Sequence, residues 1–378
     1  MTPVLRRLDS WLWPSAPPER LAIFRILTGL FTVGYLAVRL PVFLALAHRE
    51  RSSFDPIGVL WFLRTPLPAA AVTGLAFVAV VLGIAYTAGV AFRLVGPVFA
   101  VVLLVLTTYR SSWGQLLWFE DLAVLHVLIV GFAPSADAFA VRRGPAARRD
   151  SQAYGAPVRL AAAVTVATYL LSGVAKLRLG GLGWMSADTL RNHIAYSAAR
   201  LEVLGGTASP LAAWLVAHTS FLAPLAVGTV ALEVGAPMAL LGGRIRTGWV
   251  VATWLLHTGI AMTLLVVFPY PLCGVAFAPF FRLERAPQVA RAWRARFLST
   301  RPPSDRPSVG EGLAGGVPGV QRLLARALLG PSPEPLGRRS RLRYRMLAAI
   351  TSWLNPRMSA SRSRSSSTAV SSPARKRW

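Results

Sequence analysis

The 378-residue sequence is poor in cysteine and in acidic residues. Its single cysteine, Cys273, excludes a disulfide within the chain. Only 15 residues are Asp or Glu against 41 that are Lys or Arg, so the net charge is +26. Such a charge can indicate nucleic-acid binding, but here the basic residues gather between apolar blocks and near the C-terminus. That distribution is typical of a membrane protein, so we expect membrane lipids as partners and no nucleic acid.

Lysine is scarcer still. It occurs only at Lys176 and Lys376, so the other 39 of the 41 basic residues are arginine. Arginine effectively never loses its proton in a protein, whereas lysine can. Nearly all positive charges in this chain are arginines. A lysine inside the apolar part of the chain therefore indicates a need for a basic group that can lose its proton.

What the sequence has in abundance is apolar residues, which make up 54% of the chain and occur in blocks of about 20. Blocks of that length cross the hydrocarbon core of a bilayer. We therefore predict an all-α integral membrane protein, a bundle of 7–8 transmembrane helices, because open strands cannot span lipid. The predicted spans are about 21–46, 69–91, 94–108, 116–133, 158–178, 221–242, 247–268 and, as a short eighth, 269–281, with a short helix over 210–218 before the sixth.

The charge distribution predicts three regions and an orientation. Residues 1–20 form a cytoplasmic N-terminal segment, 21–282 the transmembrane domain, and 283–378 a basic, largely disordered cytoplasmic tail, rich in Pro, Ser and Arg. Within the tail, 342–354 suits a basic amphipathic helix on the inner leaflet. The basic loops 134–157 and 243–247 are predicted to be cytoplasmic, which places both termini inside. The arginines of the first loop disagree with this orientation, since that loop must face out.

Ionisable side chains within predicted spans mark functional sites, because burying a charge in lipid costs at least about 2.5–3.5 kcal/mol at mid-span. Lys176 ends a polar stripe on the fifth span, with Thr165, Tyr169 and Ser172 at spacings of four, three and four residues. Such a stripe lies on one face of a helix and is expected to face the bundle interior. The alternative for Lys176 is a side chain that snorkels to the outer interface.

Three other groups pass the same test. Glu120 and Asp121 open the fourth span, where they either cap a helix N-terminus or form part of a site. The predicted topology places Asp121 near Lys176, as a neighbour across a cavity. Glu233 and His257 are both predicted near the midplane of consecutive helices, as a carboxylate–imidazole pair that is either functional or holds two helices together.

His126 belongs to the fourth span as well. It lies about 140° around the helix from Asp121. We therefore interpret it as a hydrogen-bonded core histidine rather than as a member of a site.

Several short motifs resemble those of a known family. Gly173-Val-Ala-Lys176-Leu177 followed by Trp184 resembles the Gly-Val-x-Lys-Leu…Trp segment of vitamin K-dependent γ-glutamyl carboxylase and of the related bacterial HTTM (horizontally transferred transmembrane) domain proteins. Supporting motifs run through the predicted transmembrane domain: Arg25-Ile-x-x-Gly29, Trp118 before the acidic pair, Glu233 in Leu-Glu-x-x-x-Pro, and His257. The carboxylase has a histidine just after the tryptophan of its fourth-span motif, whereas Trp118 is followed by Phe119 and Glu120.

The resemblance implies a chemistry. In that family the lysine deprotonates reduced vitamin K, whose oxygenated form then removes a γ-proton from a glutamate to which CO₂ adds. By resemblance, Lys176 is the base, with Glu120 and Asp121 as catalytic partners. A reduced, vitamin K-like quinone would then lie against the residues Tyr169, Trp184, Glu233 and His257.

Two classes of function remain open at this stage. One is a quinone-using, carboxylase-like membrane enzyme with Lys176 as base. The other is a non-enzymatic membrane protein: a transporter, a lipid-interacting protein, or a maturation factor for a secreted peptide.

Overall fold

The computed structural model describes residues 9–114, 120–141, 150–286 and 288. This part of the chain is helical, with one isolated β-bridge between Ala16 and Ser151 and no strand, so the all-α prediction is confirmed for it. Trp118, the arginines of 142–149, the predicted helix at 342–354 and nearly all of the predicted tail lie outside the described residues.

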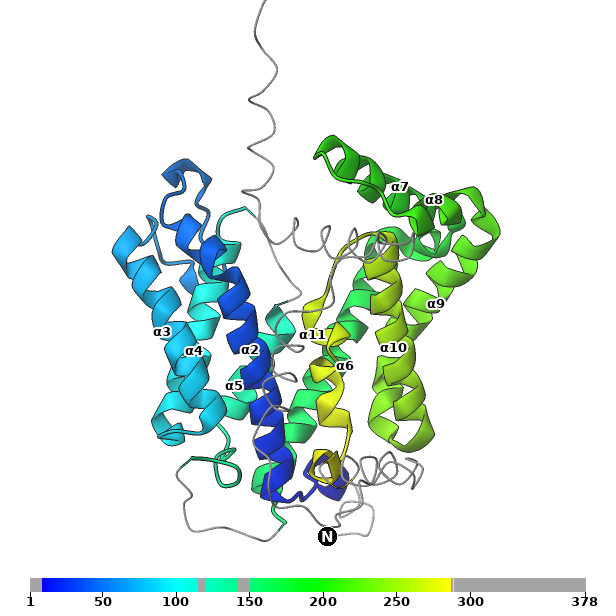
Figure 1. The fold of residues 1–378 in the computed structure, drawn as a ribbon. Helices are drawn as coiled ribbons and strands as arrows, with labels where there is room; N and C mark the ends of the chain where they lie inside the picture. The colour runs from blue at the N-terminus through cyan, green and yellow to red at the C-terminus, as the bar shows by residue number, and fades with distance from the viewer. Residues whose placement is uncertain (1–8, 115–119, 142–149, 287, 289–378) are drawn as a thin grey trace, which may run out of the picture. The chain divides into compact units, whose positions relative to one another are not determined.

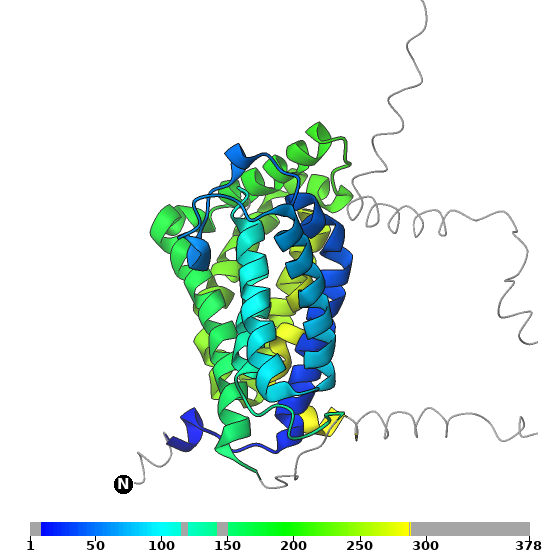
Figure 2. The same ribbon diagram turned by 90° about the vertical axis from the view of Figure 1, so that its left-hand side faces the viewer.

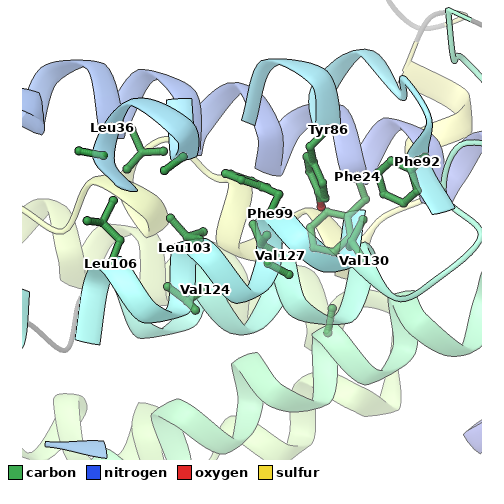
Figure 3. Close-up of a cluster of buried hydrophobic side chains, with 14 of the residues drawn as sticks. Phe24, Leu36, Tyr86, Phe92, Phe99, Leu103, Leu106, Val124, Val127 and Val130 are labelled. Atoms are coloured by element: carbon green, nitrogen blue, oxygen red, sulfur yellow. The ribbon is translucent and has the colours of Figure 1, made fainter. Parts of the chain in front are cut away.

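The helices form two groups (Figure 1). The first group packs in chain order, and its members are α2 (Pro18–Leu46), α3 (Ala69–Ala88), α4 (Phe92–Ser111) and α5 (Asp121–Gly131). Their facing sides bury one apolar core, in which Phe99 contacts Tyr86 and lies with Leu103 and Val127 (Figure 3). Glycine permits a close approach of α4 and α5: a Cβ at Gly96 or Gly131 would lie under 3 Å from the backbone oxygen of the other.

The second group contains α6 (Gln152–Gly180), α9 (Leu222–Val234) and α10 (Gly243–Thr263). α5 contacts α6 and so joins the two groups. At one end, the 3₁₀ turn η3 (Gly181–Met185) leads into α7 (Ala187–Val203) and α8 (Pro210–Ala217), which lie across the end of this group (Figures 1 and 2). Ser186 and Ser209 cap α7 and α8 with their hydroxyls, and Gly181, at φ 56°, ends α6.

Four described helices are long and apolar enough to cross a membrane, and they are Pro18–Leu46, Ala69–Ala88, Phe92–Ser111 and Gln152–Met185. The last of these is α6 continued by η3. α8 and the segment Thr219–Val234 make a fifth if they are counted as one span bent by 90°. The predicted first, second, third and fifth spans thus correspond to observed helices.

The other four predicted spans differ from the observed helices. α5 is an apolar helix of 11 residues, and α9 ends at Val234, before Gly235 and Pro237, where a 3₁₀ turn η5 (Ala236–Leu241) follows. Proline lacks the N–H that a continuing helix needs, and its ring clashes with the preceding turn. α10 ends at Thr263, and the predicted eighth span is only the four-residue α11 (Pro269–Leu272) and the 3₁₀ turn η6 (Val275–Phe280).

The segments predicted to be cytoplasmic meet at one end of the bundle. Arg20, at the start of α2, pairs with Glu284 in the turn η7 (Leu283–Arg285) at 2.7 Å. Arg25 donates to the backbone oxygens of Ser135 and Phe139, and Ser151 bridges to Ala16. The chain just before α2, the loop after α5 and the end of the helical body therefore lie together.

Candidate functional site

The polar stripe predicted on the fifth span is real. Thr165 is fully buried and Tyr169 nearly so, and Ser172 and Lys176 continue the line toward the end of α6. Each of the four side chains hydrogen-bonds to a group on another helix or turn, or to a neighbour in the stripe. The prediction that this face of α6 points into the bundle is confirmed.

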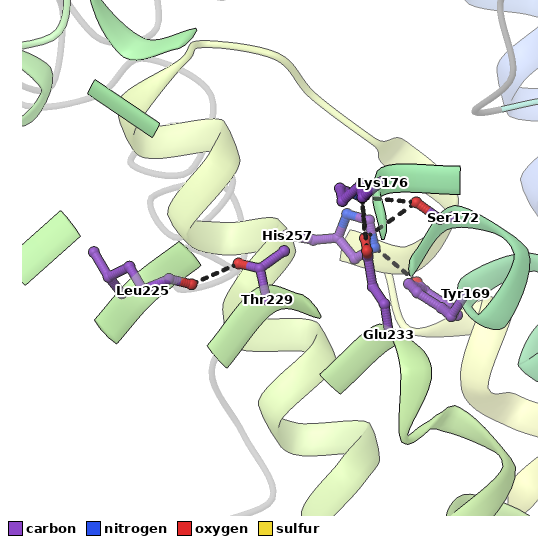
Figure 4. Close-up of polar contacts among 7 residues, drawn as sticks. All are labelled: Tyr169, Ser172, Lys176, Leu225, Thr229, Glu233 and His257. Carbon is purple, nitrogen blue, oxygen red and sulfur yellow. Dashed lines mark hydrogen bonds and ion pairs between the residues drawn. The ribbon is translucent and has the colours of Figure 1, made fainter. Parts of the chain in front are cut away.

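Lys176 is held by a carboxylate from α9. Its Nζ donates to both Glu233 oxygens at 2.6 Å and to Ser172 Oγ at 2.8 Å, and Ser172 Oγ donates to Glu233 Oε1 at 3.2 Å (Figure 4). Glu233 is buried, whereas 21% of the lysine side chain remains exposed. Lys176 and Glu233 therefore form a short, charge-assisted hydrogen-bonded pair, and part of the lysine side chain remains accessible.

Gly173 explains how α9 comes so close. A Cβ at this position would lie 2.9 Å from Glu233 Cβ and 2.9 Å from Val234 Cγ2. Only glycine permits that approach without a shift of the helices. Because Gly173 precedes Lys176 by three residues, it lies on nearly the same face of α6. The Gly-x-x-Lys spacing thus brings a partner helix, and its carboxylate, to the lysine.

His257 of α10 joins the same cluster through a different partner. Its Nε2 lies 2.7 Å from Tyr169 Oη, and no contact joins it to Glu233, so the predicted Glu233–His257 pair is wrong (Figure 4). Lys176 takes the Glu233 carboxylate instead. His257 Nδ1 is buried and has no hydrogen-bond partner among the described residues.

Trp184 borders the accessible side of the lysine. The centre of its ring lies 5.0 Å from Lys176 Nζ, which is a cation–π distance. Trp184 belongs to η3, just past the end of α6. Five predicted site residues thus come together at one place, and they are Lys176, Tyr169, Glu233, Trp184 and His257.

Glu120 and Asp121 lie elsewhere. Glu120 is buried and accepts hydrogen bonds from Arg110 and Tyr35, while Asp121 is exposed and makes no hydrogen bond or ion pair with the described residues. The expected neighbourhood of Asp121 and Lys176 is therefore not observed. The start of α5 lies against the end of α4, so Glu120 pairs with Arg110 there, while Asp121 points to the surface.

Sequence reasoning missed Arg110 and Tyr35. Arg110 was expected in a loop, but it lies in the last turn of α4 and is only 7% exposed. One signal was available: a buried carboxylate needs a nearby cation, and Arg110 is the arginine that precedes it along the chain. Tyr35 and Glu120 line a small cavity, and its other lining residues are Phe31, Thr32, Leu103, Thr107, Ala123, Val124 and Pro269.

His126 is a hydrogen-bonded core histidine, as predicted. Its Nδ1 lies 2.7 Å from Tyr270 Oη, and its Nε2 lies 3.0 Å from Thr165 Oγ1 and 3.1 Å from the Ala161 backbone oxygen. Because that backbone oxygen can only accept, Nε2 carries the hydrogen and Nδ1 accepts from the tyrosine. Both ring nitrogens are satisfied, so the histidine ties α5, α6 and α11 together.

Compared with protein-family models, curated proteins and solved structures, this chain matches none.

Proposed function

We propose that the chain is a membrane-embedded enzyme that removes a proton from a lipid-soluble acidic substrate, with Lys176 as the base. The observation that carries this proposal is the contact of Lys176 Nζ with both Glu233 oxygens at 2.6 Å, on a lysine whose side chain is partly accessible. The scarcity of lysine in the chain supports it, because arginine would satisfy a purely electrostatic role.

Glu233 gives the lysine a way to become a base. Transfer of one proton from Lys176 Nζ to Glu233 leaves a neutral amine beside a carboxylic acid. The site as a whole keeps the same net charge, so apolar surroundings do not oppose the transfer as they would oppose an isolated charge. The amine then takes the hydroxyl proton of the substrate and is again an ammonium, adjacent to the oxyanion that it has produced.

A reduced quinone fits the remaining groups. It supplies an acidic hydroxyl on an apolar ring, and His257 Nδ1 is a buried polar atom that lacks a partner among the residues that the structure describes. Tyr169 holds the opposite nitrogen of that imidazole and so fixes the direction of the free one. Trp184 offers a ring face beside Lys176. We assign the hydrogen-bonding role to His257, the orienting role to Tyr169 and the stacking role to Trp184.

We place the site in the carboxylase-like, HTTM-type architecture that the motifs resemble, with seven to eight crossings and both termini cytoplasmic. α5, α10 and the bent pair of α8 and α9 would lie within the bilayer in addition to the four long spans. The 21 residues of α10 reach about 31 Å, the thickness of the hydrocarbon core. The meeting of residues 16–20, 135–139 and 283–285 at one end supports a common side for both ends of the body.

The test is the anaerobic absorbance change of a reduced naphthoquinone when its hydroxyl loses a proton. Wild type is expected to produce the anion, and Lys176→Arg and Glu233→Gln to slow its formation by about 10²-fold or more. The matched control is Arg178→Lys, which exchanges the same two residue types at the same helix end. Full activity of folded Lys176→Arg would overturn the role of Lys176 as base.

A transporter is the second candidate, favoured by the 90° bend between α8 and the segment Thr219–Val234. Interrupted helices commonly form substrate sites in transporters, and the longer half of this one carries the buried Glu233. Vesicles separate the candidates: substrate uptake that requires Glu233 but survives Lys176→Arg would favour transport.

A further inference from the structure

We infer that the chain binds the phosphate of an anionic phospholipid at the end of the bundle where α2 and α6 begin. The site consists of Arg159 of α6, the ring of Trp11 that lies over its guanidinium, and the backbone of the turn η5. The ligand binds there as a lipid of the surrounding membrane and not as a substrate. The inference does not depend on the proposed function, because the cluster around Lys176 is built from other residues.

The chain just before α2 is fixed against the start of α6. Ala16 and Ser151 exchange two backbone hydrogen bonds, at 3.1 and 3.0 Å. Gly155 lets the segment come this close, because a Cβ there would overlap the backbone oxygen of Pro14. Residues 9–12 are helical and lie at the end of the bundle opposite α7 and α8 (Figures 1 and 2). Backbone contacts therefore set the position of this segment.

Arg159 lies one turn after Gly155 on the same face of α6, and so it meets the segment. Its Cζ lies 4.1 Å from the centre of the Trp11 ring, which is a cation–π distance. Its Nη1 and Nη2 both donate to the Leu240 backbone oxygen in η5, at 3.3 and 3.4 Å. A guanidinium has five N–H donors, and this one, on a partly exposed side chain, directs two of them to a single oxygen. The ring and the carbonyl thus hold the plane of the guanidinium and leave donors for a ligand.

Positive charge in this part of the bundle lacks an internal counter-charge. Arg159 forms no ion pair with any residue that the structure describes. Leu240 is followed by Arg244 and Arg246 at the start of α10, and neither has an ion pair with a described residue either. Nε of Arg246 is buried without a hydrogen-bond partner among the same residues. A phosphate supplies the missing negative charge through charge-assisted hydrogen bonds.

The depth of Arg159 assigns that phosphate to a lipid. α6 carries no charged side chain between Arg159 and Lys176, and at 1.5 Å per residue the two lie about 26 Å apart along the helix. That stretch spans most of the hydrocarbon core of about 30 Å, so Arg159 falls at one boundary between hydrocarbon and headgroups. Trp11, Leu12 and Trp13 are 43%, 47% and 52% exposed, and tryptophan is enriched at that boundary.

The lipid that fits is anionic rather than zwitterionic. A zwitterionic headgroup brings an ammonium group, which Arg159, Arg244 and Arg246 all repel. The headgroup of phosphatidylglycerol carries the phosphate charge and no cation, and basic side chains near a membrane surface attract such lipids. Arginine also binds phosphate through two parallel hydrogen bonds, a geometry that a lysine ammonium does not match.

The test measures thermal unfolding of the full chain in a non-ionic detergent after co-purified lipid has been removed. Phosphatidylglycerol, or phosphatidylcholine with the same acyl chains, is added in increasing amounts. A lipid that binds only the folded chain raises the unfolding midpoint as its concentration passes its dissociation constant. We expect phosphatidylglycerol to raise the midpoint of wild type more than phosphatidylcholine does. Equal shifts would overturn the requirement for an anionic lipid.

Arg159→Gln tests the arginine. The amide can still donate to the Leu240 oxygen, but the charge is lost, so the apparent affinity for phosphatidylglycerol should fall about tenfold or more. Arg93→Gln is the matched control, because Arg93 is an exposed arginine at the start of α4, at the same end of the bundle (Figure 1). An equal loss of affinity in both variants would overturn the site, since the lipid would then respond only to net charge.

Trp11→Leu keeps the arginine and remains informative if Arg159→Gln does not fold. It should reduce the preference for phosphatidylglycerol over phosphatidylcholine about threefold or more, because the guanidinium loses the ring that holds it. Trp13→Leu is the control, since it removes a similarly exposed indole that stacks on no described cation. A preference that stays at the wild-type value in Trp11→Leu would overturn the site.

Glycerol 1-phosphate distinguishes a lipid from a free phosphate. Added at the same concentrations, it should leave the unfolding midpoint of wild type unchanged, because it lacks the acyl chains that hold a lipid phosphate at this depth. A shift as large as that produced by phosphatidylglycerol would overturn the lipid assignment in favour of a soluble anion.

Discussion

Lys176 Nζ lies 2.6 Å from each carboxylate oxygen of Glu233, and this contact joins α6 to α9 beside a glycine. Opposite charge alone does not explain this pair. The pair also depends on Gly173, because α9 occupies the space that a side chain at position 173 would need.

Replacing Gly173 should therefore destabilise the bundle. Gly173→Ala forces a Cβ within 2.9 Å of Glu233 Cβ and Val234 Cγ2, and we expect a loss of about 1–3 kcal/mol, the usual cost of overpacking. The measurement is the thermal unfolding midpoint in detergent. Gly228→Ala is the control, since nothing lies within 4 Å of the place that its new methyl group would take on α9. An unchanged midpoint for Gly173→Ala would contradict the close approach.

The buried pair of Arg110 and Glu120 gives a second prediction. Both side chains are at most 7% exposed, so removing one partner leaves an uncompensated buried charge. We expect Arg110→Met to cost about 3–5 kcal/mol. The double variant Arg110→Met with Glu120→Gln should recover a large part of that loss, which a double-mutant cycle measures. Additive losses would mean that the two residues do not act as a pair.

The pair of Arg20 and Glu284 predicts a pH dependence of stability. Hydrogen bonds from Arg20 lower the pKa of Glu284 from its usual value. A lowered carboxyl pKa stabilises the folded state fully above the unfolded value, about 4.3, and the contribution is lost as pH falls through the folded value. The contribution should be under about 1 kcal/mol, as for other partly exposed pairs.

The measurement for this pair is the difference in unfolding midpoint between wild type and Glu284→Gln. Wild type should be more stable at pH 7, and the difference should shrink as the pH is lowered below about 4.3, the usual carboxyl value. Glu50→Gln is the control, because it makes the same substitution at an exposed loop position. A difference that grows on acidification would contradict the sign.

The proposed topology predicts which positions an impermeant thiol reagent reaches in intact cells. In a Cys273→Ser background, a cysteine replacing Glu50 should be labelled from outside, because its loop lies at the end opposite residues 16–20. A cysteine replacing Ser371 should be protected until the membrane is opened. Labelling of the Ser371→Cys chain in intact cells would reverse the orientation.

The sequence by itself determined the helical class, the places of four long apolar helices and the polar face of α6. Periodicity and length carry that information, because a span needs a fixed number of apolar residues and a helix repeats its faces at a fixed interval. The orientation that the basic loops predict stays a prediction.

Only the tertiary structure decided which charges pair. Sequence does not give the rotation of α9 and α10 about their axes. It therefore could not tell that Glu233 pairs with Lys176 while His257 pairs with Tyr169. In the same way, the packing of α5 against α4 pairs Glu120 with Arg110, a pairing that the sequence analysis does not predict. Which charges pair depends on which helix faces touch. Small residues such as Gly173 allow two helices to come close at one place. The sequence of a single helix does not show which other helix will approach it there.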